Sequence, residues 1–221
     1  MLNLAAFESA TLRTLPYVWG DVGQVFTTEE AAREVAASFP IGQARRRESK
    51  PAADKAYRML SCPLVEGGER LDAVHRLDAR WQDLVSELLS PSFTGALATA
   101  TELPLTETSL EVRASAYSTG CFLGPHTDRS DKMLSVILYL EPDWSPEDGG
   151  ELSILRSDDP HDEAARIEPH LGTAALLVRS EGSWHQVLPV RAPRSGLRRS
   201  VLVHYWRWPP ARPVQQPLES T

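Results

Sequence analysis

The sequence places a histidine and an aspartate two residues apart, His126 and Asp128, in the stretch GCFLGPHTDRSDKM at residues 120–133. This stretch runs directly into the apolar segment MLSVILYL. At the end of a strand, a single intervening residue lets an imidazole and a carboxylate turn to the same side. Two imidazoles and one carboxylate form the ligand set of mononuclear non-haem iron sites, which leaves three metal positions open. Polar turn residues produce the same short pattern, so the pair alone leaves both interpretations open.

A third ligand has to come from a distant strand end, and five other histidines are available. His185 opens a strand directly after EGSW, where a side chain can reach the end of a sheet. His75 belongs to a helical pattern, opposite its apolar stripe, and His161 and His170 lie in polar turns. His204 lies in the middle of a strand and is either core or pocket lining. We therefore expect His185 to complete the metal site.

An arginine follows this histidine at a distance of 13 residues, in the stretch SGLRRS. Strand alternation puts Arg198 and Ser200 on one face and Arg199 on the other. An arginine that faces the inside of a barrel requires a carboxylate partner. A dicarboxylic co-substrate provides one through a bidentate ion pair.

The first half of the chain has helical patterns. TTEEAAREVAASFP contains a threonine N-cap, acids in the first turn and Pro40 as a stop. Residues 69–89 predict a second helix because their apolar side chains recur at helical spacing. That stripe consists of Leu71, Val74, Leu77, Trp81, Leu84, Val85 and Leu88. Between the two patterns, residues 44–58 (ARRRESKPAADKAYR) carry six basic and two acidic side chains, which favours a solvated loop.

The second half changes to short β-branched and aromatic segments separated by turn residues. These segments are SLEVRASAYS, MLSVILYL, GELSIL, TAALLVRS, WHQVLPV and RRSVLVHYW. Six or more strands after two or more helices predict an antiparallel sandwich or open barrel backed by helices. VILYL is almost entirely apolar, so we expect it to be a central strand covered on both faces.

In this order, the set His126-x-Asp128, His185 and Gly196-x-Arg198-x-Ser200 resembles the Fe(II)- and 2-oxoglutarate-dependent dioxygenases, closest to their prolyl 4-hydroxylase-like branch. The opening PYVWGDVGQVFTTEEAAREVAASFP is similar to the start of bacterial members, and the resemblance is specific from about residue 111 to 206. It implies a mainly β, α+β fold: a double-stranded β-helix (jelly-roll, cupin-like) core. One domain is expected over 1–221, with a helical part at about 1–105 and the β core at about 106–208.

The resemblance also implies the chemistry and the residues that carry it. The expected reaction is hydroxylation of an unactivated C–H bond with Fe(II), 2-oxoglutarate and O2, with ascorbate as a supporting reductant. The carboxylate of Asp128 favours hydroxylation over chlorination, because related halogenases have a small residue there. The expected metal ligands are His126, Asp128 and His185. The expected 2-oxoglutarate-binding residues are Arg198, Ser200, Tyr139 and Tyr117.

The expected substrate is a small molecule, such as an amino acid, a short peptide or a natural-product intermediate. It could be tethered to an acidic carrier protein that docks on the basic 44–58 segment. The alternative is a protein residue, as in prolyl hydroxylases. The candidate substrate contacts are Trp184, Lys132, Asp131, Arg58 and Trp206.

Two other classes fit part of the pattern. A cupin-type dioxygenase or zinc hydrolase would use the same metal ligands without requiring the buried arginine, and a non-catalytic binding module would lack one ligand.

The composition of the chain limits the classes of partner that we expect. The net charge of −7 argues against nucleic acid, and no apolar run approaches the roughly 18 residues of a membrane span. Two cysteines and a start without signal-peptide features favour the cytoplasm.

Overall fold

A computed structural model describes residues 1–49, 57–191 and 196–207, and within these residues it contains twelve antiparallel strands. The large sheet is ordered β1 (Trp19–Val22), β10 (Ala174–Val178), β7 (Lys132–Tyr139), β12 (Leu197–Arg207), β5 (Thr108–Ser118) and β3 (Tyr57–Glu66). Strands β2 (Arg45–Ser49) and β4 (Glu69–Arg70) also pair with β3. The small sheet is ordered β6 (Leu123–His126), β11 (His185–Val187), β8 (Leu152–Leu155) and β9 (Glu163–Ile167).

From β5 onward the chain passes back and forth between the two sheets. β5, β7, β10 and β12 belong to the large sheet, and β6, β8, β9 and β11 to the small one. One backbone pair, Tyr57 with Leu123, links the sheets through β3 and β6. This alternation is the topology of a double-stranded β-helix, so the fold class predicted from the sequence is confirmed.

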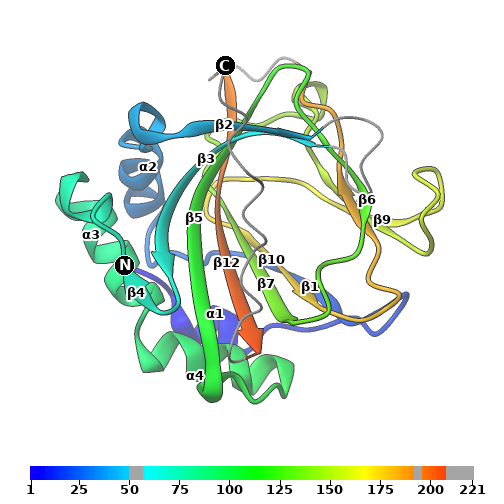
Figure 1. Cartoon of the computed structure of the whole chain (residues 1–221), viewed down its shortest axis with the longest axis horizontal. Coiled ribbons are helices and arrows are strands. Elements are labelled where there is room, and N and C mark those ends of the chain that lie inside the picture. Colours follow the sequence, from blue (N-terminus) through cyan, green and yellow to red (C-terminus); the bar gives the residue numbers. More distant parts are fainter. Residues whose placement is uncertain (50–56, 192–195, 208–221) are drawn as a thin grey trace, which may run out of the picture.

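Four helices lie beside the large sheet, while β6 and β9 lie on the opposite side of the molecule (Figure 1). The helices are α1 (Leu4–Glu8), α2 (Glu29–Ala37), α3 (Ala79–Leu88) and α4 (Pro91–Thr101). Short 3-10 helices connect the elements at Ile41–Gln43, Val74–Arg76, Leu105–Glu107 and Pro146–Asp148. Helix side chains such as Phe7, Val35 and Phe93 share one apolar cluster with Val201 and Val203 of β12. The helices therefore cover the outer face of the large sheet.

Strand β12 shows how the sequence separates the two faces. Val201, Val203 and Tyr205 are fully buried in the cluster beneath the helices. The alternating residues, which include Arg198 and His204, line a cavity on the inner face. The VILYL segment lies in β7 between β10 and β12, so its predicted central, doubly covered position is confirmed.

The helix prediction for residues 28–39 is confirmed, since the Thr28 hydroxyl caps α2 by accepting a hydrogen bond from the Ala31 N–H at 3.1 Å. The helix predicted over residues 69–89 is wrong in its first half. Asp78 caps α3 by accepting from the Trp81 N–H at 3.0 Å, so the helix starts at Ala79. Residues before Asp78 form β4 and a 3-10 turn instead.

The expectation of a helical N-terminal half is incomplete, because β1, β2, β3 and β4 also come from it. Residues 45–49 of the expected solvated loop form β2, while residues 50–56 lie outside the described part. All six strands predicted in the second half are present. Strands β6 and β9 and helix α4 were not predicted, and the turn residues 192–195 are not among the described ones. Within the described ranges, no helix has the length and apolar character needed to cross a membrane.

Trp81 of α3 packs against residues of α2 and beyond it, so its substitution tests the packing of the helical layer. Its side chain is fully buried, its indole N–H donates to the Val35 carbonyl at 3.1 Å, and its ring packs edge-on against Phe39. We expect Trp81→Ala to lower the free energy of unfolding by about 3–5 kcal/mol in denaturant titrations. Arg80→Ala is the control on the same helix, because its ion pair with Glu34 is exposed and contributes about 1 kcal/mol at most. Equal losses in the two variants would contradict this packing role.

Candidate functional site

A cavity of about 420 Å³ lies between the two sheets. Its walls include Leu123, His126, His185 and Val187 from the small sheet. Side chains from β5, β7, β10 and β12 form the facing wall. The cavity brings together residues that are far apart in the sequence, as expected for a double-stranded β-helix.

Two histidines face each other at the edge of the small sheet. His126 is the last residue of β6 and His185 the first residue of β11, and they are direct partners in the antiparallel register. Their ring centroids lie 4.2 Å apart. The Nδ1 of His126 lies 2.9 Å from the Gly124 carbonyl oxygen, and that of His185 lies 2.9 Å from the Ser183 carbonyl oxygen. A carbonyl oxygen can only accept, so each Nδ1 carries the proton and each Nε2 is the nitrogen that can act as a metal ligand.

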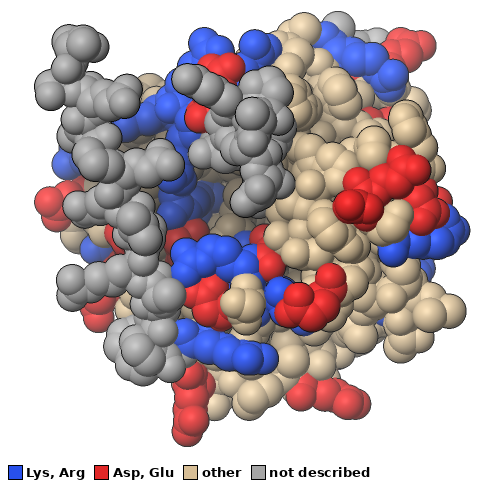
Figure 2. Space-filling model, turned by 45° about the vertical axis from the view of Figure 1, so that its right-hand side comes forward, with Lys and Arg blue, Asp and Glu red and all other residues tan. Residues whose placement is uncertain are grey.

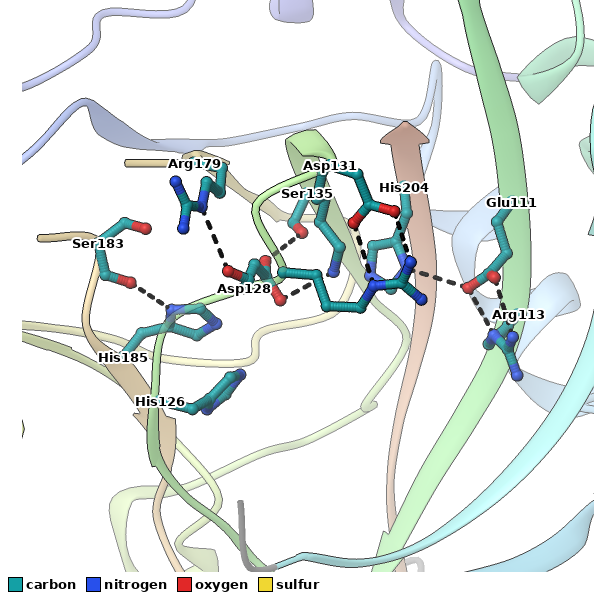
Figure 3. Close-up of polar contacts among 12 residues, drawn as sticks. Glu111, Arg113, His126, Asp128, Asp131, Ser135, Arg179, Ser183, His185 and His204 are labelled. Carbon is teal, nitrogen blue, oxygen red and sulfur yellow. Dashed lines mark hydrogen bonds and ion pairs between the residues drawn. The ribbon is translucent and has the colours of Figure 1, made fainter. Parts of the chain in front are cut away.

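Asp128 lies in the connection from β6 to β7, where the chain crosses from the small sheet to the large one. The Lys132 ammonium donates to Oδ1 at 2.8 Å and the Ser135 hydroxyl donates to Oδ2 at 2.8 Å. Arg179 Nε donates to the Asp128 backbone carbonyl at 3.2 Å (Figure 3). These contacts fix both the backbone and the carboxylate of this residue.

The side chains of His126, Asp128 and His185 converge as the H-x-D pattern and the distal histidine predicted. Each offers one ligand atom, and these atoms lie within 4.8 Å of one another. All three residues are less than a tenth exposed. A carboxylate has about four acceptor positions, so an oxygen of Asp128 can accept a hydrogen bond from Lys132 or Ser135 and also ligate a metal. The donor set of two nitrogens and one oxygen therefore fits a first-row divalent cation such as Fe(II).

The buried guanidinium of Arg198 lies on the facing wall. It is 2 % exposed, and its Nε donates to the Gly150 carbonyl at 2.7 Å. Among the described residues its Nη2 has no hydrogen-bond partner, although it is shielded from solvent. Tyr117 and Tyr139 flank it, with their ring centroids 5.4 and 5.1 Å from its Cζ. A buried cation with an unused donor is a site for an anion.

The tyrosines add a second unused group beside this cation. Within the described chain the Tyr139 hydroxyl is buried without a hydrogen-bond partner. Burial raises the pKa of Tyr139 and of Tyr117 to about 12 against the opposing effect of Arg198, so both phenols are protonated donors. Ser200 is fully buried directly across from Tyr139 in the β12–β7 register. Arg198, Tyr139, Tyr117 and Ser200 therefore lie together, as the sequence predicted.

Two glycines let the chain approach Arg198 closely. Gly149 and Gly150 have φ values of +67° and +79°, which side chains disfavour. A Cβ on Gly149 would lie 2.4 Å from the Pro189 carbonyl oxygen, and one on Gly150 would lie 2.9 Å from Val190 and 3.3 Å from Arg198. The GG pair in the sequence thus marks the turn that supports the guanidinium.

Only some of the five candidate substrate contacts line the main cavity. Lys132 and Trp206 line the cavity, and the Lys132 ammonium lies 4.9 Å from the centre of the Trp206 ring system. Asp131 lies beside them but forms an ion pair with Arg129. Arg58 donates to the Thr119 carbonyl and lines a separate cavity of about 240 Å³, and Trp184 is not among the residues that line the main cavity.

Sequence reasoning missed a charged group on the cavity wall. Arg113 donates twice to the Glu111 carboxylate, at 2.6 and 2.9 Å, and His204 Nδ1 lies 3.2 Å from the same carboxylate (Figure 3). Glu111, Arg113 and Tyr117 are separated by even numbers of residues on β5, so they share its inner face. The alternation of these residues along β5 is the feature of the sequence that could have identified them.

Comparisons with known proteins agree with this geometry. Residues 112–207 match the family model of the 2OG-Fe(II) oxygenase superfamily. No curated protein matches the sequence. Among solved structures, a Pseudomonas putida prolyl-4-hydroxylase is similar over 93 % of this chain and 99 % of its own, with a TM-score of 0.60 and 20 % identity.

A Burkholderia pseudomallei oxidoreductase of the 2OG-Fe(II) oxygenase family covers 93 % of this chain and 91 % of its own, with a TM-score of 0.63 and 18 % identity. HygX from Streptomyces hygroscopicus, solved with nickel, 2-oxoglutarate and hygromycin B bound, covers 86 % of this chain and 83 % of its own, with a TM-score of 0.54 and 13 % identity. The segment 112–207 is thus similar to the 2OG-Fe(II) oxygenase superfamily, and most of the chain shares its fold with solved structures from that superfamily.

Proposed function

We propose that this protein is a 2OG-Fe(II) oxygenase that hydroxylates an unactivated C–H bond of a small molecule, such as an amino acid, a short peptide or a natural-product intermediate. The observation that carries the proposal is the pairing of two features in one cavity. A convergent His126, Asp128 and His185 group lies on one side, and the unsatisfied buried guanidinium of Arg198 lies on the other. A metal site alone would fit several metalloenzymes, whereas the buried arginine adds a requirement for an anion.

The first group is suited to hold the iron. His126 and His185 would bind it through Nε2, because both Nδ1 protons are held by backbone carbonyls. Asp128 would contribute a carboxylate oxygen while Lys132 and Ser135 keep its plane fixed. Iron held there together with 2-oxoglutarate would supply, with O2 as the oxidant, the chemistry needed to break an unactivated C–H bond.

The second group is suited to hold the far carboxylate of 2-oxoglutarate. Neither Arg198 Nη2 nor the Tyr139 hydroxyl has a hydrogen-bond partner among the residues that the structure describes, and both are buried. A carboxylate between them would satisfy both groups and neutralise the buried cation. Tyr117 lines this end of the cavity, and Ser200 lies opposite Tyr139 in the register of β12 and β7.

The remaining walls keep water away from the reacting centre. Ile137, Leu152, Leu177 and Val187 line the cavity, and each is at least nine-tenths buried. Their apolar surface lowers the local dielectric and strengthens the ion pair at Arg198. The chain thus binds, orients and shields, while the cofactor supplies the oxidising chemistry.

The size of the cavity supports a small substrate, and its lining is rich in charged side chains. A volume of about 420 Å³ falls in the range of small-molecule pockets. Five cationic side chains line it, against two carboxylates. The cations are Arg47, Arg113, Arg129, Lys132 and Arg198, and the carboxylates are Glu111 and Asp128. Basic side chains also border the hollow near the centre of the face in Figure 2.

The similar structures include both substrate classes, since one is a prolyl-4-hydroxylase and HygX was solved with hygromycin B bound. A protein residue therefore remains the alternative substrate. Docking of an acidic carrier at residues 44–58 and a cytoplasmic location stay predictions. Residues 45–47 on β2 are exposed arginines, and substituting them would test whether a carrier docks there.

The metal assignment is tested by calorimetric titration with Ni(II). We expect His126→Ala and His185→Ala each to weaken Ni(II) binding by at least about 100-fold, because each removes a direct ligand. The control is His170→Ala, since His170 is exposed and pairs with Glu168. Retained affinity in His185→Ala together with loss in His170→Ala would move the third ligand to His170.

The co-substrate assignment is tested by titrating anaerobic Fe(II) enzyme with 2-oxoglutarate and following the metal-to-ligand charge-transfer band. Removing one partner of a buried ion pair costs about 3–5 kcal/mol. Arg198→Ala should therefore weaken 2-oxoglutarate binding by roughly two to three orders of magnitude. Arg198→Lys should fall between, because lysine keeps the charge but loses the planar fork.

Arg199→Ala is the matched control for that titration. Strand alternation directs the Arg199 side chain to the opposite face of β12. Its backbone N–H donates to Glu141. Its removal should change 2-oxoglutarate affinity by less than about threefold. If neither variant altered the titration, the dioxygenase mechanism would lose its support beyond the metal ligands.

A further inference from the structure

The inner face of the large sheet carries a row of polar residues far from Arg198. Glu111 of β5, His204 of β12 and Ser135 of β7 are direct partners across three neighbouring strands. His204 lies six residues beyond Arg198 on β12, which corresponds to about 20 Å along the strand. All three residues line the cavity. The row therefore lies away from the Arg198 end of the cavity and contacts Asp128 through Ser135.

The carboxylate of Glu111 fixes the protonation of one His204 nitrogen. Arg113 donates to both Glu111 oxygens, and the hydrogen bonds from Arg113 and His204 hold the pKa of Glu111 well below its usual value despite burial. An ionised carboxylate can only accept hydrogen bonds. The contact of 3.2 Å between Glu111 and His204 Nδ1 therefore requires the proton to be on Nδ1.

The second nitrogen of His204 is left without a proton. The charged groups around the ring are Lys132 on β7, Asp128 in the β6–β7 connection, and Glu111 and Arg113 on β5. Burial and the Lys132 ammonium lower the pKa of His204 to about 4, against the opposing effects of Glu111 and Asp128. The ring is therefore neutral at pH 7, and no hydrogen bond from a described residue reaches its Nε2.

We propose that His204 is a specificity-determining residue, whose Nε2 accepts a hydrogen bond from a hydroxyl or N–H group of the substrate at the end of the cavity remote from Arg198. This inference rests on the proposed function and adds a chemical requirement for the substrate. Trp206, whose ring is perpendicular to that of His204 at 5.8 Å, supplies an aromatic wall beside the acceptor. The substrate thus carries a hydrogen-bond donor next to a surface able to pack on an indole.

The first experiment examines the acceptor directly and needs no substrate. Zn(II)- and 2-oxoglutarate-loaded full-length enzyme, labelled with ¹⁵N in its histidine rings, is studied by NMR at neutral pH, and His204→Phe identifies the His204 signals. We expect a protonated Nδ1 and an unprotonated Nε2. A protonated Nε2 would overturn the proposal, whatever the substrate.

The second experiment measures substrate recognition. Free L-amino acids and dipeptides are screened with Fe(II) and 2-oxoglutarate, and succinate release identifies the best probe. With that probe, we expect His204→Phe to raise KM by about tenfold, the effect of one lost hydrogen bond. His204→Gln should recover most of the affinity, because its amide oxygen can accept. The matched control is His75→Phe, an exposed position on a 3-10 turn, which should leave KM unchanged.

The two experiments separate the inference from the function on which it rests. If wild type binds neither Ni(II) nor 2-oxoglutarate, the proposed function is wrong. If wild type turns over the probe and KM stays the same in His204→Phe, only the His204 proposal is wrong. Equal losses in His204→Phe and His204→Gln, with weakened Ni(II) binding in both, would also overturn it and assign His204 a structural role through Ser135 and Asp128.

Discussion

The antiparallel pairing of β12 between β5 and β7 is the constraint on which the site depends. The register sets Arg198 opposite Tyr117, Ser200 opposite Tyr139, and His204 opposite both Glu111 and Ser135. A slip of one residue would turn every one of these β12 side chains toward the helices. The helices prevent such a slip, because it would move Val201 and Val203 out of the main core. Apolar packing on one face therefore fixes the chemistry on the other.

The second requirement is that the two sheets meet at Asp128. The histidines belong to the small sheet, whereas the groups that orient the carboxylate, Lys132 and Ser135, belong to β7 of the large one. Asp128 lies in the connection between the sheets, so its position depends on both. The Lys132 ammonium neutralises the carboxylate but also repels a cation beside it. A metal held there would therefore be bound less tightly, but by a carboxylate whose position is fixed.

The sequence was most informative where one residue pattern determined one structure. Short β-branched and aromatic segments between turn residues identified the six strands of the second half, and the order of residues from His126 to Arg198 identified groups that meet in the cavity. It failed where tertiary contacts decide. Leu71, Val74 and Leu77 fit a helical period, but the cap at Asp78 starts the helix later. Strand β6, with the sequence LGPH, contains a glycine and a proline and has no strand pattern of its own.

Charged residues on β5 show the same limit within the site. Glu111 and Arg113 suggest a solvent-facing strand when the sequence is considered alone. Only the pairing with β12 shows that this face lines the cavity. Arg58 was expected at the substrate because it ends a basic segment, yet the fold directs it to the Thr119 carbonyl. Local patterns predicted which residues have reactive chemistry, and the strand register decided which of them meet.

The outer strands of the sheet order, β1 and β9, carry a further consequence. An open edge offers backbone groups with which a strand of another molecule can pair. At β1, the backbone of Arg13 exchanges two hydrogen bonds with Trp19, so the protein's own N-terminal segment occupies part of this edge. At β9, Glu163 and Arg166 form an ion pair on the strand, and charged side chains disfavour a neighbouring strand. The strands at both ends of the order are therefore protected against pairing with a strand of another molecule.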